Sequence, residues 1–156
     1  MRTLFVAAAA AALSFAAQAQ VPQYGPSVNL DQAKKLIAGA EAEARKINVP
    51  MAIAVVDPSG QMVAFLKMDN TQTASIAVAT DKGVSAAIYR RPTKVFQDAL
   101  AGGGAGLRIL SLRGASAVEG GLPVVVDGKI VGAIGVSGGT PEQDGQVAKG
   151  GVDALK

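Results

Sequence analysis

The chain contains neither histidine nor cysteine among its 156 residues, and this absence limits the chemistry it can perform. Most zinc sites, thiolate nucleophiles and Ser-His-Asp triads need one of those side chains. We therefore expect no protein-bound metal site and no disulfide. The groups left for binding or catalysis are carboxylates, arginines, hydroxyls and the backbone N–H groups of glycine-rich segments.

One glycine-rich segment stands where an anion could bind. Gly138 and Gly139 directly precede Thr140, the expected N-cap of a helix. A helix N-terminus presents free N–H groups and the positive end of the helix dipole. Ser137 would add a hydroxyl, and Arg91 can pair with a carboxylate through two hydrogen bonds. The same glycines also suit tight turns and helix caps, so both interpretations stay open.

Glu119 is the candidate for general acid–base catalysis. Gly120 and Gly121 follow it and precede an expected strand, so the two glycine-rich turns can face one pocket. Glu142 and Asp144 fall in the first turn of the last expected helix, where solvated acids favour the helix dipole. Because the sequence pairs no second acid or base with Glu119, it does not define a catalytic mechanism.

Residues 1–19 have the three parts of a secretory signal peptide. Arg2 supplies the positive region, residues 4–15 form an apolar run too short to span a bilayer, and Ala17 and Ala19 have the spacing that signal peptidase reads. We expect cleavage after Ala19 and a mature protein that is periplasmic or secreted. No later segment has the length and apolar character of a membrane span.

The elements of the N-terminal half follow from local signals. Residues 20–29 contain Pro22, Gly25 and Pro26 and predict an irregular arm. Asn29 and Gln32 have the spacing of a capping box before a helix. The expected elements are a helix over 30–47, strands over 51–56 and 61–68 joined by a β-turn at 57–60, and a helix over 73–90.

The C-terminal half predicts a second hairpin. Asp127 and Gly128 favour a type I′ turn between two apolar strands, and Gly132 and Gly135 inside the second strand indicate close backbone approach or a bulge. The expected elements are a short helix over 93–100, a strand-like segment over 107–112, strands over 122–126 and 129–136, and a final helix over 141–155 capped by Thr140.

This order of elements predicts one α+β domain over residues 30–156. Two hairpins separated by helices favour a mostly antiparallel sheet with helices packed on it. The formal net charge is only +3, and no basic cluster is interleaved with aromatic residues. We therefore expect no nucleic-acid partner.

Several segments resemble the GlcG/HbpS-like group of haem-binding proteins, which also contains the C-terminal domain of PduO-type proteins. The resemblance covers nearly all of residues 30–155. The segments that carry it are 51–60 and 63–69 for the first hairpin, 91–93 for the break after the long helix, 119–124 and 132–139 for the second hairpin, and 141–144 for the last helix.

The resemblance implies a profilin-like fold with a five-stranded antiparallel sheet. It also implies homo-oligomers built from dimers, octamers among them, and binding of haem or a related tetrapyrrole. Arginines would then pair with the propionates, with Lys82 a further candidate cation. Tyr89 is a candidate iron ligand or a packing residue, and Thr93 is a candidate haem contact or a helix N-cap.

Two ligand-binding hypotheses follow, beside a third in which the protein is a structural oligomer or an accessory protein that binds a partner. The first is an exported protein that binds haem or another tetrapyrrole as a carrier, scavenger or sensor component, and is not an enzyme. The second is an enzyme that acts on a small oxygenated carboxylic acid, with Glu119 as its catalytic group. The residues expected to contact the ligand are Tyr89, Arg90, Arg91, Thr93, Glu119, Gly120, Gly121, Ser137, Gly138 and Gly139.

Overall fold

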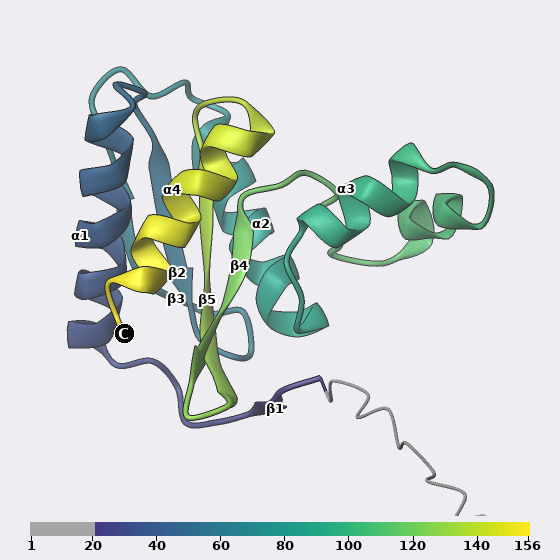
Figure 1. Ribbon diagram of the computed structural model, residues 1–156, viewed down its shortest axis with the longest axis horizontal. Coiled ribbons are helices and arrows are strands. Elements are labelled where there is room, and N and C mark those ends of the chain that lie inside the picture. The colour runs from purple at the N-terminus through teal and green to yellow at the C-terminus, as the bar shows by residue number, and fades with distance from the viewer. Residues whose placement is uncertain (1–20) are drawn as a thin grey trace, which may run out of the picture.

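Strand β5 (Lys129–Ser137) has neighbours along both of its edges in the computed structural model (Figure 1). It pairs antiparallel with β2 (Ala52–Val56) on one side and with β4 (Gly121–Val126) on the other. Strand β3 (Met62–Lys67) pairs antiparallel with β2 and forms an edge of the sheet. The short β1 (Gln23–Tyr24) runs parallel to the start of β5. The α+β class and the five-stranded sheet are thus confirmed.

The structure describes residues 21–156, so the expected signal peptide lies outside the described residues. Within residues 21–156, no helix has both the length and the apolar character needed to cross a membrane. The same part of the chain holds no cluster of three carboxylates that could bind a metal ion.

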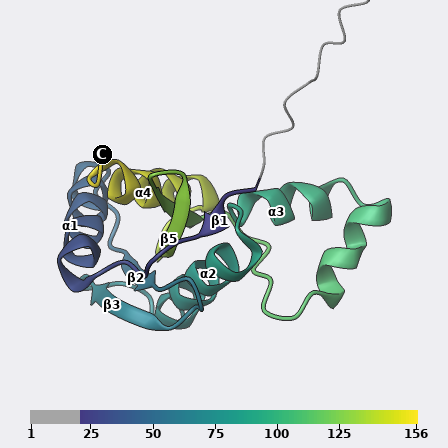
Figure 2. The same ribbon diagram turned by 90° about the horizontal axis from the view of Figure 1, so that it is seen from below.

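Helices cover both faces of the sheet. Helices α1 (Leu30–Lys46) and α4 (Pro141–Asp153) pack against each other on one face, and α2 (Ser75–Tyr89) packs on the other (Figure 2). Helix α3 (Lys94–Ala101) and the 3₁₀ helix η1 (Gly104–Ser111) extend sideways from the sheet as an arm (Figure 1).

The two faces bury different side chains because alternate residues of a strand point to opposite sides. Ile53 and Val55 of β2 join the large aliphatic core under α1 and α4. Ala52 and Ala54 face α2, whose own buried residues include Ala79. The alanine-lined side lets α2 lie unusually close to the sheet.

Local signals predicted the starts of α1 and α4 and the first turn correctly. Asn29 and Thr140 each form a complete capping box, with Gln32 and Gln143 respectively. The carboxylate of Asp57 accepts hydrogen bonds inside the first turn, as expected of a turn former. These contacts join residues only two to four positions apart, so the sequence specifies them directly.

Two expectations about strands are wrong. In the segment 107–112, residues 107–111 belong to η1 rather than to a strand, because Gly103 and Gly104 adopt positive φ and turn the chain back onto α3. Short-range hydrogen bonds such as Leu112 N–H to Ile109 O then satisfy its backbone. The fifth strand is instead β1, in the arm expected to be irregular, and it is parallel to β5.

Gly135 is required where α2 crosses β5. A Cβ atom at Gly135 would overlap the carbonyl oxygen of Ala79 and the backbone nitrogen of Gly83. Both neighbours are backbone atoms of a helix and cannot rotate away. The close approach predicted for the glycines of this strand is therefore confirmed.

We predict that Gly135→Ala lowers the free energy of unfolding by about 3 kcal/mol, because the added methyl group forces α2 away from the sheet. Gly102→Ala is the matched control, since its φ is −72° and its nearest neighbour would be 3.5 Å away. It should change stability by less than about 1 kcal/mol. Urea unfolding of both variants measures the difference, and equal midpoints would contradict the packing described for α2 and β5.

Candidate functional site

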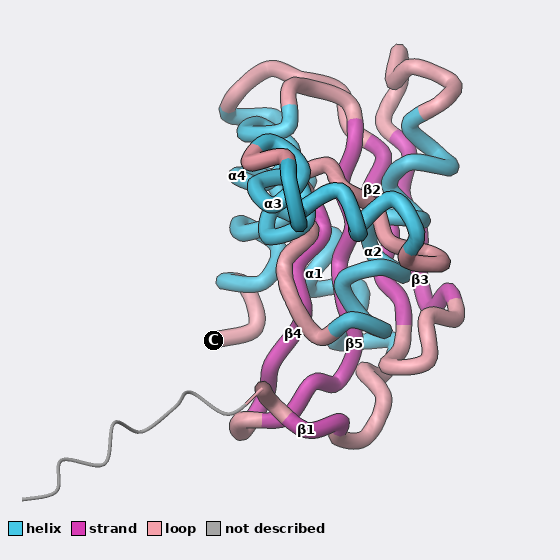
Figure 3. The backbone as a smooth tube through the Cα atoms, turned by 90° about the vertical axis from the view of Figure 1, so that its right-hand side faces the viewer, coloured by secondary structure: helices cyan, strands magenta, loops and turns pink. Residues whose placement is uncertain are grey.

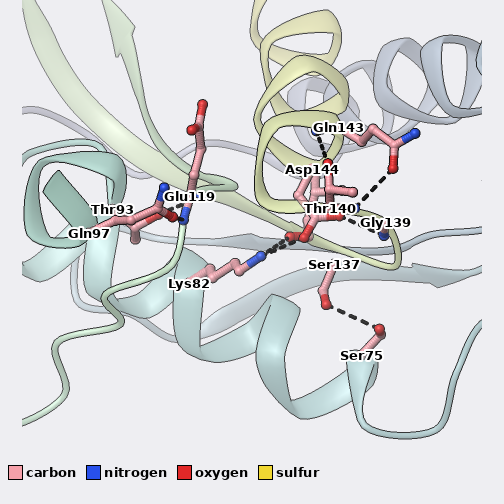
Figure 4. A network of polar contacts seen from close by, with 12 residues as sticks. Ser75, Lys82, Thr93, Gln97, Glu119, Ser137, Gly139, Thr140, Gln143 and Asp144 are labelled. Carbon is pink, nitrogen blue, oxygen red and sulfur yellow. Dashed lines mark hydrogen bonds and ion pairs between the residues drawn. The ribbon is translucent and has the colours of Figure 1, made fainter. Parts of the chain in front are cut away.

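Lys82 and Asp144 form an ion pair in the interior (Figure 4). Lys82 lies in the middle of α2 and is 1% exposed, and Asp144 lies in the first turn of α4 and is 3% exposed. The Lys82 Nζ atom donates to Asp144 Oδ2 at 2.7 Å and to the carbonyl oxygen of Val136 at 3.1 Å. The Asp144 Oδ1 atom accepts from the Gly139 N–H at 2.9 Å. The pair therefore connects α2, β5 and α4.

The interior position of this pair corrects two expectations. Asp144 is not a solvated acid, and Lys82 is not free to bind a propionate. Loss of hydration raises the pKa of Asp144 above its ordinary value, and the hydrogen bonds from Lys82 and Gly139 act in the opposite direction. The helical spacing of Ala79, Lys82 and Ala86 is a signal that places the lysine on the buried side of α2.

Thr93 anchors the start of β4. Its backbone N–H donates to the carbonyl oxygen of Gly121 at 3.0 Å, and its hydroxyl oxygen accepts from the Gly121 N–H at 2.9 Å. Thr93 also holds the N-cap position of α3, as one of its two interpretations predicted, but its fully buried side chain makes no capping hydrogen bond there. Gly120 is needed beside it, because its φ is +124° and a Cβ atom there would meet Asp144 and Lys82.

The N-terminal end of α4 already holds a carboxylate of the protein itself. The Gly139 N–H, which we expected to face an anion, donates to Asp144. Ser137 is buried, and its hydroxyl donates to the hydroxyl of Ser75 at 3.1 Å. Gly138 sits against the backbone of Pro50 and Met51. This end of the sheet is therefore filled by internal contacts.

Glu119 and Arg91 bind different partners. The Glu119 N–H donates to Gln97, and its carboxylate lies 4.0 Å from Lys94 Nζ. Figure 4 shows that this carboxylate points away from Lys82. Arg91 donates from Nε to the carbonyl oxygen of Tyr89. In the described residues 21–156 no hydrogen bond or ion pair joins Glu119 to Arg91.

Tyr89 is held in place by packing. Its ring meets that of Phe96 edge to face, with centroids 5.2 Å apart, and its hydroxyl donates to the carbonyl oxygen of Arg113 at 2.7 Å. The guanidinium of Arg91 lies over the Phe96 ring, with its Cζ atom 5.7 Å from the ring centroid. Tyr89 therefore fixes the junction between α2 and the arm.

An apolar groove of about 390 Å³ lies between β4 and the end of α4. Strand β4 and the C-terminal end of the chain, which both contribute residues to it, are marked in Figure 3. Among the residues predicted to bind ligand, Arg90 lines this groove. The apolar lining residues are Pro22, Pro92, Leu122, Pro123, Val125, Ile130 and Val152, and the charged ones are Arg90, Lys149, Asp153 and Lys156.

The groove was missed by sequence reasoning because its residues come from four distant segments. Pro22 precedes β1, Pro92 follows α2, Val125 lies on β4 and Val152 on α4. Neither the spacing nor the composition of any one segment indicates a shared surface. A volume of this size is within the range of small-molecule sites, and apolar walls with few charged groups are typical of them.

Comparison with known proteins agrees with the resemblance seen in the sequence. Residues 28–153 match the family described as "Haem degrading protein HbpS-like". The chain is 36% identical over 131 residues to a 15.0 kDa protein of Citrobacter freundii encoded between dhaT and dhaS, which covers 83% of this chain and 92% of the relative.

Two solved structures share the fold. HbpS of Streptomyces reticuli, solved as a double mutant, has a TM-score of 0.77 and 28% identity, covering 97% of this chain and 99% of that one. The complex of PduOC with haem has a TM-score of 0.74 and 25% identity, covering 82% of this chain and 94% of that one.

The buried ion pair predicts a large loss of stability when one partner is removed. Lys82→Met leaves the Asp144 carboxylate without its counter-charge, and we expect a loss of about 3–5 kcal/mol. The double variant Lys82→Met, Asp144→Leu should recover most of that loss, because no unpaired charge stays buried. Urea unfolding measures both.

The matched control is Lys94→Met, which breaks the exposed pair with Asp98. That change should cost less than about 1 kcal/mol, because water already screens the two charges. Similar losses in Lys82→Met and Lys94→Met would contradict the structural role given to the interior pair.

Proposed function

Because the chain belongs to the HbpS-like family of proteins described as haem-degrading, we propose that it binds haem or another tetrapyrrole in the apolar groove beside β4. It would act as a carrier, a scavenger or a component of a sensor. The observation that carries the proposal is the groove itself, which offers apolar walls and an arginine to a ligand with an apolar body and carboxylates. A structural relative that was solved with haem supports the same ligand class.

The lining residues fit the macrocycle better than the iron. Leu122, Val125 and Val152 can contact the flat apolar face of a tetrapyrrole, whereas the groove contains no histidine, cysteine, methionine or tyrosine. Those four side chains are the usual protein ligands of haem iron. When bound, haem would supply a redox-active iron centre, and the residues of this chain would contribute binding and orientation.

Tyr89, Thr93 and Met51 could offer an oxygen or sulfur atom to iron, but all three are engaged or buried elsewhere in the protein. The hydroxyl of Thr93 is buried against Gly121, and that of Tyr89 donates to Arg113. Met51 is fully buried in the aliphatic core. We therefore infer that affinity comes from burial of the macrocycle and from its carboxylates rather than from a bond to iron.

We further propose that the mature chain acts in the periplasm or outside the cell, after removal of residues 1–19. We also propose that it forms homo-oligomers. The arm supports this, because Leu107 is 54% exposed and Leu110 is 75% exposed. Leucines this exposed on a projecting element are typical of a surface that another chain covers.

Hemin and metal-free protoporphyrin IX should bind with dissociation constants within about threefold of each other, because iron adds no bond in the groove. Val125→Glu should weaken both by at least about tenfold, since it places a charge on an apolar wall. Val95→Glu is the matched control, because Val95 is 46% exposed, Val125 is 45% exposed, and Val95 lies outside the groove.

Absorbance titration for hemin and fluorescence titration for protoporphyrin give these constants, and the chain has no tryptophan to interfere. Hemin binding more than about tenfold tighter than protoporphyrin binding would contradict the inference about iron. Equal effects of the two glutamate variants would contradict the location of the site.

Native mass spectrometry of protein recovered after export tests processing and assembly together. We expect a subunit mass that begins at Gln20 and an assembly mass that is an even multiple of it. A subunit that retains residues 1–19 would contradict the signal peptide, and a monomer at micromolar concentration would contradict the oligomer.

A further inference from the structure

Arg90 has a backbone conformation that an arginine rarely adopts. It follows the last residue of α2 with φ +54° and ψ +38°, in the left-handed region. Glycine is the usual residue at this place after a helix, because a Cβ atom there costs free energy. An arginine held in this strained conformation indicates that its side chain has a use.

The guanidinium of Arg90 has no acidic partner. None of the ion pairs among residues 21–156 includes Arg90, which lines the groove. The other two cations of the groove, Lys149 and Lys156, both pair with Asp153. Their hydrogen bonds hold the pKa of Asp153 below its ordinary value. Arg90 is therefore the cation without a carboxylate partner among the described residues of the groove, whereas the two lysines share one carboxylate.

Tyr24 of β1 holds this guanidinium in position. The Arg90 Cζ atom lies 5.5 Å from the centroid of the Tyr24 ring, in a cation–π contact. The Tyr24 hydroxyl lies 3.0 Å from the carbonyl oxygens of both Ala87 and Ile88, which share its single hydrogen as acceptors. These carbonyls belong to the last turn of α2, so the ring is fixed to the same helix end that carries Arg90.

From these contacts we propose that Arg90 makes the groove selective for ligands that carry a carboxylate, and that Tyr24 is the positioning residue that orients it. The inference rests on the function proposed above and defines its ligand class: a flat apolar body with at least one free carboxylate at its edge. A guanidinium binds a carboxylate through two parallel hydrogen bonds, and a fixed plane favours that geometry.

The test compares protoporphyrin IX with its dimethyl ester, which has the same macrocycle and no free carboxylate. Fluorescence titration in one co-solvent should show that the wild-type mature protein prefers the free acid by about tenfold. Arg90→Gly should lose most of this preference. Its thermal midpoint should equal or exceed that of the wild type, because glycine removes the strain at positive φ.

Two further variants test whether Tyr24 positions Arg90 and whether the preference depends on Arg90 in particular. Tyr24→Leu should reduce the preference for the free acid without abolishing it, since Arg90 stays but loses its support. Arg91→Gln is the matched control, because Arg91 is adjacent, donates to Tyr89 O and does not line the groove. It should keep the wild-type preference.

The results of these titrations test carboxylate selectivity, the role of Tyr24 and tetrapyrrole binding separately. If the wild type binds acid and ester equally, or if Arg90→Gly keeps the preference, the inference about selectivity is overturned while tetrapyrrole binding stands. If Tyr24→Leu matches the wild type, the positioning role is overturned. If the wild type binds neither ligand, the proposed function fails and the inference fails with it.

Discussion

Two opposite charges, the ammonium of Lys82 and the carboxylate of Asp144, lie 2.7 Å apart in the interior. Removing either charge from its partner would leave the other unpaired in apolar surroundings, which is far more costly than burying both. The pair therefore fixes α2 and α4 against β5 in one arrangement.

Further hydrogen bonds lead from this pair to the end of α2. The carbonyl oxygen of Val136 accepts from Lys82, and the Val136 N–H donates to the carbonyl oxygen of Gly120. Gly121 follows Gly120, and both its N–H and its carbonyl oxygen form hydrogen bonds with Thr93.

This series of contacts explains how an interior feature positions a surface site. Thr93 stands three residues after Arg90, so anchoring it to β4 fixes the end of α2 beside the groove. Tyr24 adds a second attachment, because its hydroxyl binds the last turn of the same helix. The groove is lined mostly by apolar side chains, and Arg90, its one cation without a carboxylate partner among the described residues, is held by the Tyr24 ring. A rigid charged group on an apolar wall favours binding and orientation of a ligand.

The features that the sequence predicted correctly depend on residues close together in the chain. The capping boxes at Asn29 and Thr140 and the turn at Asp57 are of this kind. Lys82 and Asp144 stand 62 residues apart, and neither has a local signal that identifies the other. The segment 107–112 has the composition of a strand, but positive φ at Gly103 and Gly104 directs it onto α3 instead. Arg90 was predicted to contact the ligand, whereas the groove it lines is formed from four segments that only the fold brings together.

The central claim is that the groove between β4 and α4 holds a tetrapyrrole by its apolar face and a carboxylate. A crystal structure of the mature protein with protoporphyrin IX tests this claim most directly. We predict electron density for the macrocycle against Val125 and Val152, with a propionate within hydrogen-bond distance of the Arg90 guanidinium. Density for the ligand at any other place on the chain, with the groove filled only by solvent, would contradict the account.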